Sequence, residues 1–293
     1  MSYRQYTDPE VTIRKDYITV SDGVGLRVID FIPRSDTDEQ PLVVFVAGWI
    51  SQITGWKEVL KQLTRRYHTI YIETREKESA RLPDDTVVEF SVDRMSRDLH
   101  ELLDLRITPG RPFYIVGSSL GSTIILEYLH RYRRLPCNVF LIAPNCEFPF
   151  PPWFIFTIQH LPVALYPPIK YVLKWYLRNF MLDRDKEPEQ VKKYEGTIDA
   201  AEPKRLRDSA LALKDYNLWD KLPQIMAPAL IIGAKTDTLH GVNEIEKMAH
   251  LMPAAKFTLM ESNKETHSEK AGALIVDAIH NDFGRESFRE HHG

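Results

Sequence analysis

Three serines lie close together in the stretch FYIVGSSLGSTII, residues 113–125, between two apolar runs. The pattern Gly-x-Ser-x-Gly places Ser119 between Gly117 and Gly121. A serine on a sharp turn from a strand into a helix can act as a nucleophile, and glycines two residues away avoid a steric clash. The alternative is that the serines are only small residues that a tight turn needs. We interpret Ser118 and Ser122 in this way. The apolar segments on both sides favour Ser119 as the nucleophile.

A nucleophilic serine needs a base and a group that orients this base. The expected order along the chain is serine, acid, histidine. Asp237 follows the apolar run PALIIGA (228–234), and His267 follows the run KFTLM (256–260). Both would lie at the same edge of a parallel sheet as Ser119, where open α/β sheets place their sites. The sequence therefore predicts a catalytic triad of Ser119, Asp237 and His267.

Each partner also has a simpler interpretation. Asp237 could be a turn residue or a helix cap between two threonines, and His267 could be a solvated surface histidine. Their joint position after strands, in the expected order, favours the triad. Glu147, which follows the run 138–144, is a weaker alternative acid. The weaker alternatives to His267 are His68, His100, His130, His240 and His250.

A serine hydrolase stabilises its oxyanion with two hydrogen-bond donors. We assign one of them to the backbone N–H of Leu120, which follows the nucleophile. The other should come from the segment AGWIS after the run 41–48, and we assign it to the backbone N–H of Trp49. The indole of Trp49 could wall the acyl pocket, or it could serve only in packing.

Strand-like and helix-like segments alternate along most of the chain of 293 residues. After an N-terminal hairpin, this alternation predicts an α/β fold, with a mostly parallel sheet and helices on both faces. The alternation breaks at 147–216, which is rich in aromatic residues and proline. We therefore expect a core of residues 1–146 plus 217–293 and a cap or lid inserted at 147–216. Prolines and charges such as Lys170 argue against a membrane span in this insertion.

Composition narrows the possible partners. The net charge of −3 gives no basic field for nucleic acid. Cys137 and Cys146 lack metal-like spacing and are interpreted as reduced thiols of a cytoplasmic protein. The first residues lack the apolar segment of a secretory signal. No metal or organic cofactor is implied, and the expected partner is a small apolar ester-type substrate. Lipid contact through the aromatic insertion is the less favoured alternative.

Outside the insertion, the chain resembles the α/β-hydrolase family. Residues 117–121, Gly-Ser-Ser-Leu-Gly, are similar to its nucleophile elbow, and Asp237 and His267 fall where its acid and histidine fall. The resemblance implies an eight-stranded sheet with a helical cap after the sixth strand. Two segments depart from the family pattern. Ala47-Gly48 stands where His-Gly is frequent, and after the fourth strand Glu76 and Glu78 occupy two glycine positions.

These residues predict a serine hydrolase that cleaves a carboxylic ester or thioester through an acyl-enzyme. The aromatic insertion suggests an apolar acyl or aryl group in the substrate. Hydrolysis of a C–C bond, acyl transfer and perhydrolysis remain alternatives on the same triad. A serine nucleophile disfavours dehalogenase and epoxide hydrolase activity, for which this family uses an aspartate. An alternative of another class is a non-catalytic protein that binds an apolar ligand under the cap.

Overall fold

A computed structural model describes the backbone of residues 3–84, 86–162, 170–172, 174–175, 179, 195–199, 201–237 and 241–290, and side chains up to residue 282. Its centre is an eight-stranded sheet with the order β1-β2-β4-β3-β5-β6-β7-β8. The strands are β1 Thr12–Thr19, β2 Gly25–Ile32, β3 Leu42–Val46, β4 His68–Ile72, β5 Phe113–Ser118, β6 Asn138–Ile142, β7 Ala229–Ala234 and β8 Ala255–Met260.

The predicted α/β architecture is confirmed. β1 and β2 form the expected antiparallel hairpin, and β2 also runs antiparallel to β4. From β4 to β8 every neighbouring pair is parallel. The central strands β3 and β5 are fully buried, as expected for parallel strands covered on both faces. The carboxyl ends of β3 to β8 therefore all lie at one edge of the sheet.

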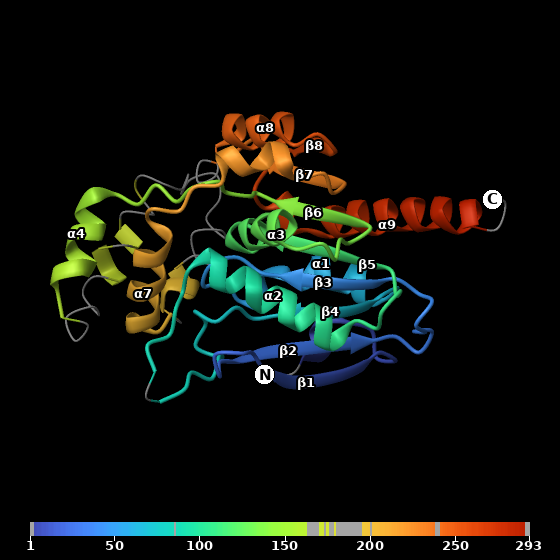
Figure 1. The fold of residues 1–293 in the computed structure, drawn as a ribbon, viewed down its shortest axis with the longest axis horizontal. Coiled ribbons are helices and arrows are strands. Elements are labelled where there is room, and N and C mark those ends of the chain that lie inside the picture. Colours follow the sequence, from blue (N-terminus) through green and yellow to red (C-terminus); the bar gives the residue numbers. More distant parts are fainter. Residues whose placement is uncertain are drawn as a thin grey trace.

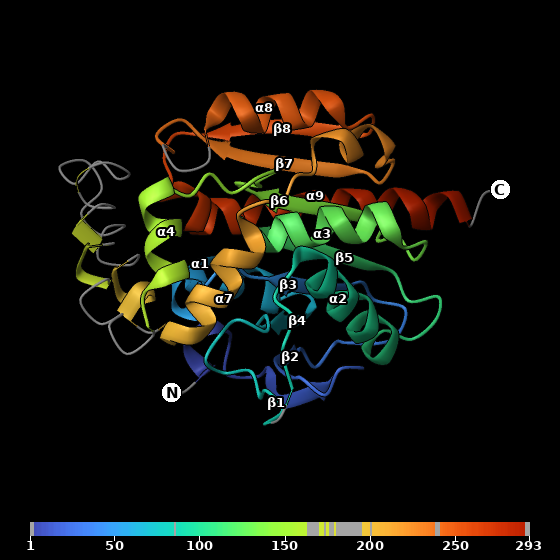
Figure 2. The same cartoon turned by 60° about the vertical axis from the view of Figure 1, so that its left-hand side comes forward.

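Helices cover both faces of this sheet (Figures 1 and 2). α1 packs against α9 on one face, and α2 packs against α3 on the other. The helices of the core are α1 Lys57–Thr64, α2 Val92–Arg106, α3 Leu120–Arg131, α8 Val242–Leu251 and α9 Glu269–Glu290. α3 is buried from Leu120 to Leu129, because it crosses the middle of the sheet. This burial explains its apolar sequence.

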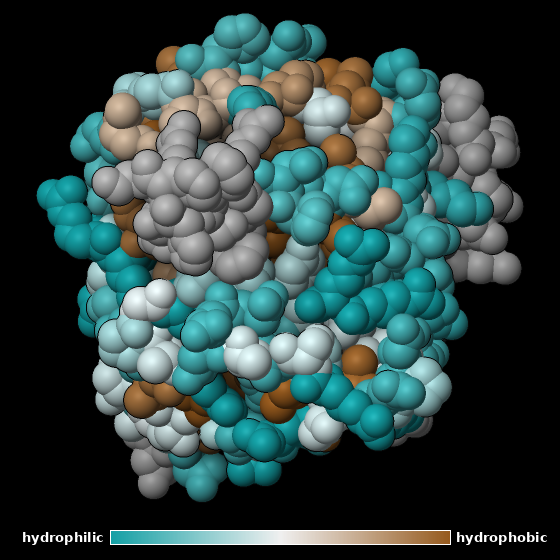
Figure 3. Space-filling view, turned by 90° about the vertical axis from the view of Figure 1, so that its right-hand side faces the viewer, coloured by the Kyte–Doolittle hydropathy of each residue, from teal (hydrophilic) through white to brown (hydrophobic). Residues whose placement is uncertain are grey.

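The insertion between β6 and β7 contributes two described helices, α4 Pro152–His160 and α7 Pro203–Leu213. They contact each other and lie at one end of the molecule, on the left in Figure 1. Much of the predicted cap at 147–216 lies outside the described residues. The opposite end of the molecule is mostly hydrophilic, with small separate apolar areas (Figure 3). Within the described part of the chain, no helix is long and apolar enough to cross a membrane.

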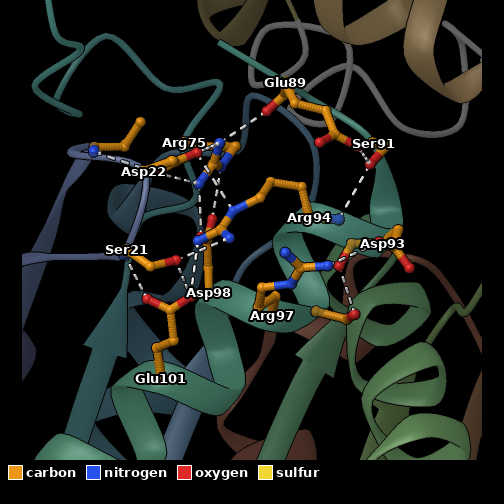
Figure 4. A network of polar contacts seen from close by, with 12 residues as sticks. Ser21, Asp22, Arg75, Glu89, Ser91, Asp93, Arg94, Arg97, Asp98 and Glu101 are labelled. Atoms are coloured by element: carbon orange, nitrogen blue, oxygen red, sulfur yellow. Dashed lines mark hydrogen bonds and ion pairs between the residues drawn. The ribbon is translucent and has the colours of Figure 1, made fainter.

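A buried ion-pair network holds the segment after β4 (Figure 4). Arg75 has no exposed surface and donates two hydrogen bonds of 2.6 Å to Asp98 on α2. It also donates to Asp22, in the turn between β1 and β2, at 2.7 Å. Burial raises the pKa of Asp98 above its usual value, although hydrogen bonds from Arg75 and Arg94 act against this rise. The network fixes the position of the turn that follows Arg75.

Candidate active site

Ser119 occupies the strained turn that the sequence predicts. β5 ends at Ser118 and α3 begins at Leu120. Between them, Ser119 has φ +49° and ψ −119°, a conformation that a residue with a side chain adopts only when its surroundings hold it. The Ser119 N–H donates a hydrogen bond of 2.9 Å to the carbonyl oxygen of Ile142 in β6. The side chain is half-buried.

The two glycines of the motif allow close packing around this turn. A Cβ on Gly121 would lie 2.1 Å from the carbonyl oxygen of Val46 in β3. A Cβ on Gly117 would lie 2.4 Å from Ile125 Cδ1. Real Cβ atoms do not approach other atoms so closely, so a larger residue at Gly121 would push the turn away from β3, and one at Gly117 would push α3 away from β5. This explains the requirement for glycine at both positions.

The N-terminus of α3 presents donors beside the nucleophile. Leu120 is the first residue of this helix. The first N–H groups of a helix have no partner within the helix, and its dipole is positive at this end. The backbone N–H of Leu120 lies at this end of α3, and its role as an oxyanion donor stays a prediction.

Residues 47–51, here called the β3 loop, lie next to Ser119. Val46, the last residue of β3, pairs with Gly117. A Cβ on Gly48 would come within 3.2 Å of Ser119 Cβ, so the backbone of the loop lies against the serine. The Trp49 indole donates a hydrogen bond of 2.9 Å to Ser209 Oγ on α7. Its ring also packs edge-on against Phe150, at 5.5 Å between centroids. The indole thus joins the β3 loop to the insertion.

His267 lies in a short 3-10 turn after β8, from Glu265 to His267. Its Nδ1 is 3.0 Å from the carbonyl oxygen of Asn263. Thr266 Oγ1 lies 3.0 Å from the same nitrogen. With the proton on Nδ1, this nitrogen donates to the Asn263 carbonyl and Nε2 is left as the acceptor. This is the tautomer that a general base for a serine needs. The ring packs on Trp56, with centroids 4.1 Å apart.

Asp237 is 5% exposed and follows β7, where its N–H bonds to the carbonyl oxygen of Ala234 at 3.1 Å. The adjacent Thr236 accepts a hydrogen bond of 3.2 Å from the Asn263 N–H. The loop that holds Asp237 is therefore bonded to the loop that holds His267. Since β5, β7 and β8 run parallel, Ser119, Asp237 and His267 all follow the carboxyl ends of strands at one edge of the sheet.

The described alternative histidines lie in β4 and in helices of the core. Glu147 is exposed and accepts a hydrogen bond of 3.3 Å from Asn217. His68 begins β4, so it lies at the opposite edge of the sheet from Ser119. Three others lie within helices α2, α3 and α8, namely His100, His130 and His250. His240 lies outside the described residues.

Sequence reasoning missed Asn145, which follows β6. Its side-chain amide donates a hydrogen bond of 3.2 Å to Ser119 Oγ. Its backbone carbonyl accepts a bond of 2.8 Å from Thr123 Oγ1 on α3, which fixes the loop. The only available sequence signal was its place after a strand at the edge where sites of α/β sheets lie.

The cysteines do not compete as nucleophiles. Cys137 and Cys146 are both free thiols, as predicted. Burial, followed by the nearby Glu147, raises the pKa of Cys146 to about 12, so its thiolate is scarce at neutral pH. Within the described residues, no group of three or more His, Cys, Asp or Glu side chains could hold a metal ion.

The fold is that of an α/β hydrolase, with a Gly-x-Ser-x-Gly turn between β5 and α3. Residues 39–268 match the family described as serine aminopeptidase, S33. The chain therefore belongs to this family, and it is a hydrolase by that membership.

Relatives and solved structures of the same fold are distant. The chain is 20% identical over 264 residues to monoacylglycerol lipase ABHD6 of Bos taurus, covering 84% of this chain and 77% of the relative. It is 21% identical to the Xenopus laevis protein monoacylglycerol lipase abhd6-B, covering 89% and 82%. An esterase from Exiguobacterium antarcticum superposes with a TM-score of 0.72 at 20% identity, covering 92% of this chain and 100% of that one. A hydrolase from Pseudomonas aeruginosa gives 0.72 at 17% identity, covering 92% and 98%.

Proposed function

We propose that this chain is a serine esterase that cleaves a carboxylic ester or thioester with an apolar acyl or aryl group. The observation that carries the proposal is the strained backbone of Ser119, at φ +49° between β5 and α3. Such strain is concentrated at functional sites, where it projects a reactive side chain. The esterase and lipase names of distant relatives agree with this class of reaction.

In the proposed mechanism, Ser119 Oγ attacks the carbonyl carbon while His267 Nε2 takes its proton. Asp237 orients the imidazole and stabilises the imidazolium that forms. The backbone N–H groups of Leu120 and Trp49 donate to the tetrahedral oxyanion. His267 then gives the proton to the leaving group. In deacylation, His267 takes a proton from a water molecule that attacks the acyl-enzyme, and it returns this proton to Ser119 as the acid is released.

Aromatic packing around the β3 loop supports an apolar acyl group. Phe150 packs on Trp49 and also on Phe154 of α4, with centroids 5.5 and 5.8 Å apart. Ligand pockets are lined mainly by such side chains. A hollow of about 360 Å³ beside this segment is lined by the apolar Phe148, Phe150, Ile155 and Phe156 and by the polar Gln159, Lys214 and Asp215. From the aromatic packing on Trp49 we expect medium-length acyl chains to be preferred over acetyl.

The test is labelling of the purified protein by a fluorophosphonate probe. Wild type should be labelled at one site, Ser119→Ala should lose the label, and the matched variant Ser118→Ala should keep it. A p-nitrophenyl ester series from acetate to laurate then measures the acyl preference. A folded wild type without labelling would contradict the proposal and favour a non-catalytic protein that binds an apolar ligand.

Further substrates, assayed beside the ester series, distinguish the other reactions that the same triad could catalyse. An aminoacyl p-nitroanilide tests the peptidase activity that the family description names. A β-diketone tests C–C bond hydrolysis, an added alcohol tests acyl transfer, and hydrogen peroxide tests perhydrolysis. We expect ester hydrolysis to exceed amide and C–C bond hydrolysis, because an ester offers a better leaving group than an amide or a carbanion.

A further inference from the structure

The turn after β4 carries charged residues that the structure buries. Glu76 is 2% exposed and Lys77 is 7% exposed. Glutamate and lysine are almost never fully buried unless they are paired, because an isolated buried charge is costly. These two residues lie in the segment that departs from the family pattern. Their partners therefore indicate what this departure does.

Both side chains hold the backbone of the β3 loop. Lys77 Nζ donates to the carbonyl oxygen of Gly48 at 3.1 Å and to Thr74 Oγ1 at 2.7 Å. Glu76 Oε1 accepts from the N–H of Ile50 at 3.3 Å and from the Thr74 hydroxyl at 2.7 Å. The Glu76 carboxylate and the Lys77 ammonium are 3.5 Å apart. One buried ion pair thus holds the loop on both sides of Trp49.

The carbonyl that Lys77 holds belongs to the same peptide unit as the N–H of Trp49. A peptide unit is planar and trans, so its carbonyl and its N–H point in opposite directions. The Gly48 carbonyl accepts from Lys77 and also from the Ser51 N–H, at 3.1 Å each, and the bonds that fix this carbonyl also fix the direction of the Trp49 N–H. A cationic donor at the carbonyl further polarises the unit and strengthens the N–H as a donor.

Ile50 supports the same interpretation. Its φ is +48°, a genuine outlier for a β-branched residue. Such strain persists only when the surrounding structure enforces it. Here the Ile50 N–H is held by Glu76, while α7 approaches the turn through a hydrogen bond from Arg205 to the carbonyl oxygen of Lys77.

We propose that Lys77, with Glu76, is a positioning group for the oxyanion site, which orients and polarises the Trp49 N–H without touching the substrate. This inference rests on the proposed esterase function. It gives the charged turn a role: Glu76, which stands where glycine is frequent in the family, and the adjacent Lys77 hold the backbone of the β3 loop.

The test compares Lys77→Met and Lys77→Gln with wild type on p-nitrophenyl butyrate. Lys77→Met keeps the side-chain length but cannot donate, so kcat should fall about 10- to 100-fold, less than for loss of the oxyanion donor itself. KM should change by no more than about 2-fold, because the group acts on the transition state. Lys77→Gln can still donate and should give an intermediate kcat. A trifluoromethyl ketone, which forms a tetrahedral oxyanion, should lose affinity in the same order.

The control is Lys221→Met, which removes another lysine bonded to a buried glutamate, Glu127. It should lower the melting temperature while kcat stays at the wild-type level. Each kcat is divided by the fraction of protein molecules that the fluorophosphonate labels at completion. Unfolded molecules, which do not react, therefore do not lower the value. Wild-type kcat in both Lys77 variants, with wild type itself labelled and active, would overturn this inference alone. A wild type that neither labels nor turns over esters would overturn the esterase proposal, and this inference with it.

Discussion

The side-chain amide of Asn145 donates a hydrogen bond to the hydroxyl oxygen of Ser119 across 3.2 Å. The two residues come from neighbouring strands, since β5 pairs with β6 and Ser118 is opposite Ile142. A donor at this place occupies a lone pair of the oxygen and leaves the hydroxyl proton free for a base. It also favours negative charge on the oxygen as the proton leaves.

We predict that Asn145→Asp slows fluorophosphonate labelling about 100-fold at pH 7.5, and Asn145→Ala about 10-fold. An ionised aspartate can only accept, so it would draw the Ser119 proton away from His267 and oppose the oxyanion. The second-order rate constant of labelling measures this effect. Asn243→Asp, exposed on α8, should label like wild type. Equal rates for all three variants would remove Asn145 from the site.

For Asp237→Asn we expect kcat/KM on the preferred ester to fall about 100-fold. This is less than the roughly 10⁴-fold loss in kcat that follows when a triad histidine takes the wrong tautomer. The reason is that the Asn263 carbonyl also accepts from His267 Nδ1, at 3.0 Å. Steady-state kinetics at pH 8 with Asp237→Asn and His267→Ala give the comparison. A loss as large as that of His267→Ala would show that the carbonyl does not hold the tautomer.

Gly121→Ala should lower the free energy of unfolding by about 3 kcal/mol. The added methyl group would lie 2.1 Å from the Val46 carbonyl oxygen, so either the turn or β3 must move. Gly196→Ala is the matched control, because a Cβ there meets nothing within 4 Å. Urea unfolding followed by circular dichroism measures both variants. Equal stability of the two would mean that the turn adjusts without cost.

Stability should depend on Glu127 in acid. Burial by itself raises the pKa of Glu127, but hydrogen bonds from Lys221, Tyr216 and Arg131 outweigh it and hold the pKa below its usual value of 4.5. A carboxyl whose pKa is lower in the folded state stabilises the fold above its unfolded pKa. That contribution is lost as the pH falls below about 4.5 and through the folded pKa.

Urea unfolding of wild type and Glu127→Gln between pH 7 and pH 3 tests this. The difference in unfolding free energy should be constant above about pH 5 and should narrow below it. Glu246→Gln, exposed on α8, should follow the wild-type curve. A difference that widens in acid would contradict the direction of the shift.

The less favoured alternative, contact with a lipid surface, would use the exposed aromatic side chains of α4. Trp153 is 39% and Phe156 64% exposed, and such rings favour membrane interfaces. On that alternative, wild type cosediments with neutral phosphatidylcholine liposomes, and the double variant Trp153→Ser/Phe156→Ser stays in the supernatant. Met226→Ser, which removes an equally exposed side chain elsewhere, should bind like wild type. No sedimentation of wild type at low salt would exclude this contact.

Local patterns sufficed for the sheet and for the strained turn at Ser119. The spacing of apolar residues predicted the strands and helices of the core. A helix buried on one face repeats apolar residues every three or four positions, and a strand buried on both faces is a continuous apolar run. The Gly-x-Ser-x-Gly motif predicted the turn at Ser119 because its glycines meet a local steric demand. The triad with Asp237 and His267 stays a prediction that chain order and sheet topology support.

By itself, the sequence determined which segments form the sheet and where the strained serine lies, since both depend on neighbours along the chain. Only the tertiary structure decided what surrounds that serine. Asn145 is 26 positions from Ser119, and Lys77 is 29 positions from Gly48, so neither contact follows from local spacing. In the sequence alone, the charges after β4 are a departure from a family pattern. Folding buries them against the β3 loop, because an ion pair can be buried where it also satisfies backbone groups.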